Sequence, residues 1–209
     1  MKMAFQLPVR IETRVITAPQ TTIYVPQVSG LSNPQVEQSL NAAIVGQVRA
    51  LMDGQRKYQP TKLMEMIGHY EIKTNERGIL SLTLSNYAYS EHMAHGFTLL
   101  ASLTFDVLTG KQYQLPDLFA PGANYVQVIS ANIAAQIKQR NLPLLNPPFQ
   151  SIAPNQAYYL ADKALVVYFA LYEITPYYVG FPMFPISVYD LQSLVTDQSP
   201  ISIMAADIS

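Results

Sequence analysis

The sequence of 209 residues contains no cysteine and no tryptophan. Without cysteine, the chain forms no disulfide, has no thiol nucleophile and cannot bind zinc or an iron–sulfur cluster through thiolates. A chain without thiols is also indifferent to the redox conditions around it, so these absences do not fix its compartment. Cysteine chemistry is therefore excluded as the basis of any function.

Charged residues are scarce as well, at 13% of the chain against about 25% in an average globular protein. The 13 basic and 14 acidic residues leave a net charge of −1, and no basic run occurs. Nothing in this balance predicts binding to the phosphates of a nucleic acid. Hydrophobic residues make up 49%, enough for a sizeable core. The 14 tyrosines suit half-buried sheets or binding surfaces.

The sequence also lacks a long hydrophobic run. Its longest apolar stretch, ALVVYFALYEI, is about half the length that a membrane-spanning helix needs. Near the N-terminus, Arg10, Glu12 and Arg14 interrupt the apolar residues before they reach the length of a signal peptide. The sequence therefore predicts neither a membrane span nor an export signal, which favours a cytoplasmic or spore-associated location.

Alternating apolar residues predict strands over residues 9–15 and 21–28, a hairpin over residues 68–89, and a strand over residues 97–107. Two further strands flank Ala161, Asp162 and Lys163, and the second, apolar on both faces, is expected in the centre of a sheet. Residues 32–59 and 122–141 carry helical apolar stripes, and Asn33 and Pro34 begin the first helix.

This order of elements predicts an α+β fold with a mainly antiparallel sheet and two main helices packed on one face. The short hairpin loops favour one compact domain over residues 1–209. Within it, residues 1–90 hold the N-terminal strands, helix and hairpin, and residues 91–195 form a C-terminal half.

Several short motifs stand in a fixed order along the chain. They are His95-Gly96, Phe105-Asp106, Thr109-Gly110-Lys111, Asp117-Leu118-Phe119, Tyr159 and Tyr172-Glu173-Ile174. In order and spacing, residues 65–195 resemble the extracytoplasmic domain of RsiV-type anti-sigma factors, which also precedes peptidoglycan deacetylases of the PdaC kind. The resemblance implies a non-catalytic recognition domain that binds lysozyme directly, and an extracytoplasmic location. The sequence shows no transmembrane helix, sigma-binding segment or deacetylase domain, so the fold and a recognition surface are what carries over.

The histidines allow a second interpretation. His92 and His95 are three residues apart, and with Asp106 as a third ligand they could bind zinc. A metal site needs three or four convergent ligands, however, and His69 is the only other histidine. The favoured alternative is that His95 bonds the backbone at the bend made by Gly96. No metal and no cofactor are therefore predicted.

The acidic residues of the motifs have local roles available. Asp106 should accept from the amides near Thr109 and Gly110, and Asp117 should cap the turn through Leu118 and Phe119. Asp162 lies in a turn between two strands. Glu173 interrupts an apolar, aromatic strand, so if buried it must be paired. An ion pair with a Lys or Arg is favoured there over a functional role.

An aromatic, proline-rich loop follows Glu173. Tyr177, Tyr178, Phe181 and Phe184 stand among Pro176, Pro182 and Pro185, with Gly180 as a hinge or turn. Aromatic side chains on a stiff loop lose little entropy on binding and would suit a protein surface or a sugar ring. The alternative is that they fold back over the core.

Three functions remain open at this point. The favoured one is a binding module, not an enzyme, that recognises a lysozyme-like hydrolase or a cell-wall glycan. Its candidate binding residues are Tyr177, Tyr178, Gly180, Phe181, Pro182, Phe184 and Glu173. The alternatives are a hydrolase or metal-dependent enzyme using His92, His95 and Glu173, and a cytosolic or spore-associated structural protein. The sequence does not predict an oligomeric state.

Overall fold

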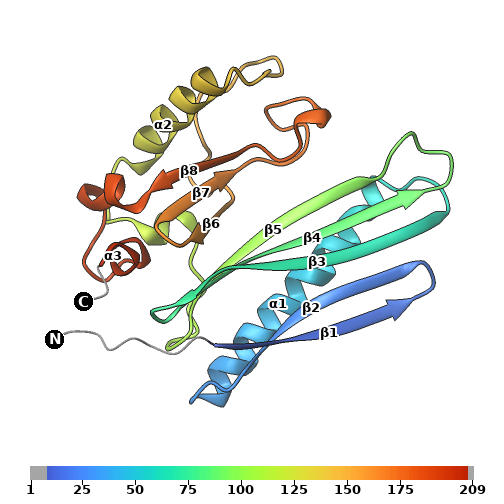
Figure 1. Cartoon of the computed structure of the whole chain (residues 1–209), viewed down its shortest axis with the longest axis horizontal. Helices are drawn as coiled ribbons and strands as arrows, with labels where there is room; N and C mark the ends of the chain where they lie inside the picture. The colour runs from blue at the N-terminus through green and yellow to red at the C-terminus, as the bar shows by residue number, and fades with distance from the viewer. Residues whose placement is uncertain (1–8, 207–209) are drawn as a thin grey trace. The chain divides into compact units, whose positions relative to one another are not determined.

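The computed structural model describes residues 9–206 and confirms the α+β class. The chain divides into two compact units, residues 1–112 and residues 113–209 (Figure 1). The strands form two sheets, one in each unit, and each main helix packs against the sheet of its own unit. The sequence predicted a single sheet with both helices on one face, and the structure has two sheets instead. The difference arises because an alternating pattern shows which residues share a face of a strand but not which strands pair. The expectation of a single compact domain stays a prediction.

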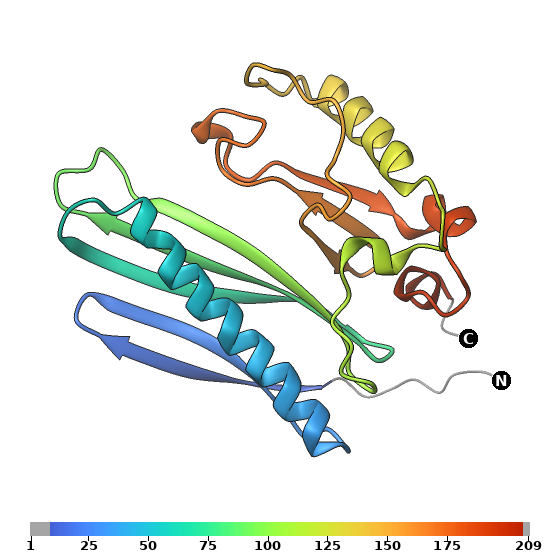
Figure 2. The ribbon, with the colours of Figure 1, turned by 180° about the vertical axis from the view of Figure 1, so that it is seen from behind.

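The first unit is a five-stranded sheet covered on one face by a long helix (Figure 2). Its strands, in spatial order, are β1 (Arg10–Ala18), β2 (Thr21–Ser29), β3 (Leu63–Glu76), β4 (Ile79–Ser90) and β5 (Phe97–Asp106). All neighbours pair antiparallel except β2 and β3, which pair parallel. A parallel pair needs a crossover connection, and the helix α1 (Pro34–Gly54) with the short η1 (Gln55–Lys57) supplies it.

The helix α1 begins where the sequence predicts. Oδ1 of Asn33 accepts from the backbone N–H groups of Gln35 and Val36, and Pro34 occupies the first helical position. The predicted apolar stripe is buried against the sheet, and it consists of Val36, Leu40, Ile44, Val48 and Leu51. Leu80, Leu82, Leu84, Leu103 and Phe105 of β4 and β5 complete this core.

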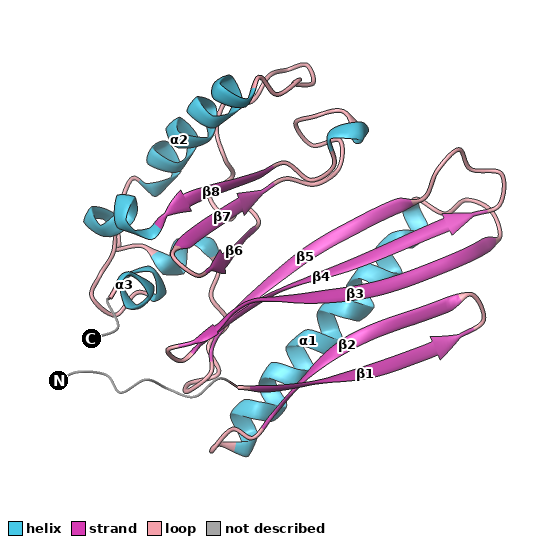
Figure 3. Cartoon of the chain, in the orientation of Figure 1, coloured by secondary structure: helices cyan, strands magenta, loops and turns pink. Residues whose placement is uncertain are grey.

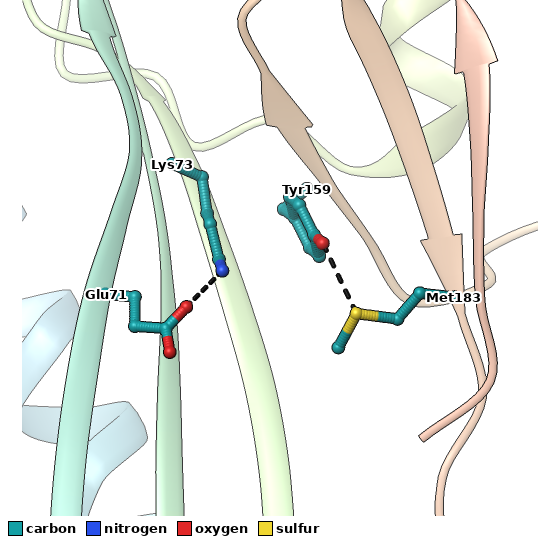
Figure 4. Close-up of polar contacts among 4 residues, drawn as sticks. All are labelled: Glu71, Lys73, Tyr159 and Met183. Atoms are coloured by element: carbon teal, nitrogen blue, oxygen red, sulfur yellow. Dashed lines mark hydrogen bonds and ion pairs between the residues drawn. The ribbon is translucent and has the colours of Figure 1, made fainter. Parts of the chain in front are cut away.

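The parallel contact between β2 and β3 is short. Thr21–Ile23 pair with Met66–Gly68, and the ladder between the two strands ends there. Beyond that point the side chain of Asn41 bonds both backbone groups of Val28. On β3, Glu71 and Lys73 form an ion pair beside a register shift in the β3–β4 ladder (Figure 4).

The second unit holds a three-stranded antiparallel sheet in the order β6–β7–β8. The strands are β6 (Tyr158–Ala161), β7 (Ala164–Tyr168) and β8 (Met183–Ser187). The central position of β7 confirms the prediction from its apolar faces, and four of its five residues are buried. The helices are α2 (Tyr125–Arg140) and α3 (Pro200–Ala205), with the short turns η2 (Leu115–Leu118), η3 (Tyr177–Val179) and η4 (Val188–Leu194).

The strand β8 corrects the sequence interpretation, which assigned residues 183–186 to a loop because of Pro182 and Pro185. An edge strand tolerates proline where no ladder N–H is needed. Here Gln136 of α2 donates to the carbonyl of Pro185 at 2.8 Å, and Arg140 donates to the carbonyl of Met183 at 2.7 Å. The outer side of β8 is thus covered by side chains of α2.

Candidate functional site

The region of the two histidines makes structural contacts. Nδ1 of His95 lies 2.9 Å from the carbonyl oxygen of Gly96. A Cβ on Gly96 would lie 2.2 Å from the ring of Tyr87, so any other residue here would require that ring to move. His92 is exposed and lies 3.9 Å from Glu91. Within residues 9–206, no group of three or more His, Asp or Glu side chains could hold a metal ion.

Asp106 and Asp117 bond backbone groups of their own turns. Oδ1 of Asp106 accepts from the N–H groups of Leu108 and Thr109 at 2.8 and 3.0 Å. Gly110, at φ 80°, returns its N–H to the carbonyl of Asp106. Asp117 accepts from the backbone N–H of Gln114 at 2.7 Å and closes a capping box on η2. Both carboxylates therefore stabilise turns.

Glu173 is not where the sequence places it. The strand β7 ends at Tyr168, and Glu173 lies exposed in the following turn. Its carboxylate accepts from the N–H of Ala170 at 2.7 Å and from the side-chain amide of Gln156 at 3.3 Å. The predicted ion pair with a Lys or Arg is replaced by these bonds, because an exposed carboxylate in a turn needs no cation to compensate burial.

The aromatic loop, here residues 169–182, joins β7 to β8. Its first residue, Phe169, is 2% exposed and meets the rings of Phe149 and Phe184 edge-on, each at 5.7 Å. Phe184 is 0% exposed and belongs to β8. Pro182 is buried too. Phe184 and Pro182 are thus core residues and cannot contact a partner, which corrects their inclusion among the candidate binding residues.

Tyrosines form the exposed part of the aromatic loop. Tyr178 is 78% exposed and Tyr172 is 50% exposed. Tyr177 is half-buried, and its ring centroid lies 5.4 Å from that of Tyr172. The half-buried Phe181 follows Gly180. Sequence reasoning missed Tyr172, because it assigned this residue to a strand instead of to the turn where its φ is 64°.

Several hydrogen bonds hold the aromatic loop in shape. The short turn η3 at its tip (Figure 3) is closed by N–H groups of Val179 and Gly180, which donate to Pro176 and Tyr177. Gly180 has φ 78° and ψ −147°, a conformation essentially restricted to glycine. The N–H of Leu145 donates to the carbonyl of Ile174. The loop therefore presents its tyrosines from a defined backbone.

The far end of the aromatic loop is held by a side-chain contact. The hydroxyl of Tyr159 on β6 donates to Sδ of Met183 at 3.4 Å (Figure 4). Met183 is the first residue of β8. Both ends of the loop are thus fixed to the three-stranded sheet, one through Phe169 and the other through Met183.

Two family models match the two units separately. Residues 17–98 match the family model described as deacetylase PdaC, and residues 116–189 match that of a protein of unknown function, DUF3298. The anti-sigma-V factor RsiV of Bacillus subtilis (strain 168) is 27% identical over 190 residues, which cover 83% of this chain. The chain is therefore similar to RsiV-like proteins along most of its length. It spans 64% of the length of that relative.

Solved structures share the fold of this chain. A DUF3298-family protein from Bacteroides fragilis superimposes with a TM-score of 0.67 at 14% identity, covering 98% of both chains. Another from Pseudomonas aeruginosa PAO1 gives 0.61 at 17% identity, covering 97% of both. No helix formed by residues 9–206 has the length and apolar character needed to cross a bilayer.

Proposed function

We propose that this RsiV-like domain is a non-catalytic recognition module whose aromatic loop binds a protein partner, a lysozyme-like hydrolase. The observation that carries the proposal is the 78% exposure of Tyr178 on a loop whose backbone is hydrogen-bonded at its tip and along its length. The similarity to an anti-sigma factor supports a sensing role.

The chemistry of the loop fits a protein surface. Tyr172, Tyr177 and Tyr178 offer apolar rings with polar hydroxyls, and tyrosine is enriched among the residues that dominate binding energies. Because the loop is already held, little further entropy is lost when these side chains are ordered. Glu173 is the only charged residue of the loop, and its carboxylate is used within the turn.

Removal of the most exposed tyrosine tests the proposal. Titration of lysozyme by calorimetry should show that Tyr178→Ala raises the Kd by about thirty-fold, the effect of losing a hot-spot aromatic residue. Tyr189→Ala is the matched control, since Tyr189 is 52% exposed but lies on η4 outside the loop. The Kd of this control should change less than about three-fold.

A salt series tests the kind of contact. Because the loop offers aromatic rings and one carboxylate that is already bonded, the Kd should change little between ~0.05 and ~0.5 M salt. A steep salt dependence would assign the binding to charged residues elsewhere.

Absence of lysozyme binding at millimolar concentration, with Tyr178-dependent binding of muropeptides, would move the proposal to a cell-wall glycan. Absence of both would remove it.

The alternative enzyme would be metal-dependent and use His92, His95 and Glu173. The described residues disfavour it, because Glu173 bonds a turn and His95 bonds the backbone at Gly96. Metal analysis of the purified protein and deacetylase assays on acetylated glycan test this alternative. A metal-dependent activity that His95→Ala abolishes would establish it in place of the recognition module.

A further inference from the structure

The strand β1 forms one edge of the five-stranded sheet, and no strand of residues 9–206 covers this edge. Eight of its nine residues are exposed, Ile11 being the exception. It comes last in the strand order, and no strand within residues 9–206 pairs with its outer side. Such an edge presents a row of backbone donors and acceptors that can pair with another strand.

The edge strand β8 of the other sheet is protected by side chains that bond its outer backbone groups. There Gln136 and Arg140 of α2 bond the carbonyls of Pro185 and Met183, and Pro185 itself offers no N–H. The strand β1 contains no proline. Among the described residues, no side chain bonds its backbone. The two edges are therefore treated differently, and β1 is open to a further strand.

Two residues of β2 show which backbone groups of β1 point outward. Val28 lies opposite Ile11. Its N–H donates to the side chain of Asn41 and its C=O accepts from the same side chain, so both groups point away from β1. Pro26, opposite Thr13, has no N–H to give. Both are therefore positions without hydrogen bonds between β1 and β2, and such positions alternate along an antiparallel pair. Ile11, Thr13 and Val15 thus direct their backbone groups to the open edge.

The side chains of β1 are complementary to those of a second β1. When two such strands run antiparallel with Thr13 opposite Thr13, Glu12 of each copy faces Arg14 of the other. Ile11 of each copy then faces Val15 of the other. Opposite charges and β-branched pairs in facing positions stabilise a sheet. Every favourable pair occurs twice because the arrangement is symmetric.

The neighbouring registers are less favourable. A pairing centred on Glu12 brings Glu12 against Glu12 and Arg10 against Arg14, and one centred on Arg14 brings Arg14 against Arg14. Like charges in facing positions destabilise a sheet. Among these three registers, the charges of β1 therefore favour the one centred on Thr13.

We propose that two copies of this chain associate through their β1 strands in this register, so that the two five-stranded sheets continue into one another across a twofold axis at Thr13. Such an interface uses the same patch on both copies. One strand edge buries less than the ~1,600 Å² of a standard interface. The dimer is therefore weak and depends on protein concentration.

Charge reversal tests the proposal on the full chain by sedimentation velocity, over concentrations up to about 1 mM. Glu12→Arg and Arg14→Glu each place like charges opposite one another twice, and each should raise the dimer Kd by about ten-fold or more. The double variant Glu12→Arg/Arg14→Glu exchanges the two charges and should return the Kd to the wild-type value. An equimolar mixture of the two single variants should associate more strongly than either alone.

A charge reversal away from β1 serves as the control. Glu65→Arg changes the net charge as Glu12→Arg does, at an exposed position of β3, and should leave the Kd within about three-fold. A wild-type chain that stays monomeric at every concentration overturns the proposal. So does a dimer whose Kd neither single reversal changes, or a mixture no stronger than its components.

A disulfide reports the register directly, because the chain has no cysteine of its own. Hydrogen-bonded facing residues have Cα atoms about 5.5 Å apart, which is within the range of a disulfide. Thr13→Cys should therefore form a covalent dimer under mild oxidation. Thr17→Cys, near the end of β1, should do so far more slowly, because its two copies lie far apart in this register. Equal rates for both variants would exclude the register centred on Thr13.

Discussion

At the scale of single residues, Glu173 shows how a carboxylate beside aromatic side chains can be structural. It accepts the N–H of Ala170 and thereby closes the first turn of the aromatic loop. The same side chain also accepts from Gln156, which in turn donates to the carbonyl of Tyr168. The start of the loop and the end of β7 are thus linked through one amide and one carboxylate.

This role predicts how substitutions of Glu173 behave. Glu173→Ala removes the acceptor and should accelerate hydrogen exchange of the Ala170 amide roughly five-fold, consistent with the loss of about 1 kcal/mol. Glu173→Gln keeps an oxygen acceptor and should accelerate it much less. Exchange measured by NMR distinguishes the two variants. Equal acceleration in both would mean that the turn requires the charge and not only the acceptor.

At the scale of elements, the two main helices begin differently, although both have asparagine at the N-cap. Asn33 bonds the N–H groups of Gln35 and Val36 at the start of α1. Asn124, before α2, makes no such side-chain bond. The same residue type therefore contributes to one helix start and not to the other.

A pair of alanine substitutions tests this difference. Asn33→Ala should lower the free energy of unfolding by about 1 kcal/mol, since two N–H groups lose their acceptor. Asn124→Ala should change it by less than about 0.5 kcal/mol, the range of neutral surface substitutions. Urea denaturation monitored by circular dichroism measures both. A loss at Asn124 as large as at Asn33 would contradict the assignment.

The elements that the sequence predicts well are those that depend on local pattern. The stripe from Val36 to Leu51 defines α1 because helical spacing is a property of neighbouring residues. The strand β8 was missed because Pro182 and Pro185 indicate a loop, and only the covering side chains of α2 make an edge strand possible there. The division into two sheets depends on distant partners, which a single sequence does not specify.

The residues of the candidate site also divide into those that the local sequence indicates and those that depend on packing. Tyr178 was a candidate binding residue, and the sequence left open whether its ring folds back over the core; it is 78% exposed. Phe184 was grouped with it, although its ring is buried against Phe169. The sequence around Tyr178 and around Phe184 is similarly aromatic and proline-rich. Which of the two rings is buried depends on packing between the two ends of the loop, which the local sequence does not show. Tyr172 was missed because the turn at Ala170 is held by Glu173 and not by a proline or glycine.

At the scale of the whole molecule, the two family models fall on different compact units. The PdaC match lies within residues 1–112, and the DUF3298 match lies within residues 113–209. The contacts that hold the aromatic loop belong to the second unit, including those of Leu145, Gln156 and Tyr159. The recognition surface proposed above is therefore built by one unit.

A shortened chain tests this assignment. Residues 113–209 expressed alone should bind lysozyme with a Kd within about three-fold of that of the full chain, because every contact named for the loop is retained. Circular dichroism confirms that the fragment is folded, and calorimetry measures its binding. A folded fragment that does not bind would mean that residues 1–112 contribute to the surface. An unfolded fragment would support the prediction of a single compact domain.

The short parallel contact between β2 and β3 has a consequence for the order of folding. The pairs β1–β2, β3–β4 and β4–β5 join strands that are neighbours in sequence, so each closes a short loop. Bringing Ile23 against Gly68 instead requires the whole of α1 to lie between them. Long-range closures are entropically costly and are made late. The β1–β2 hairpin is thus expected to join the sheet last, and to leave it first when the sheet opens.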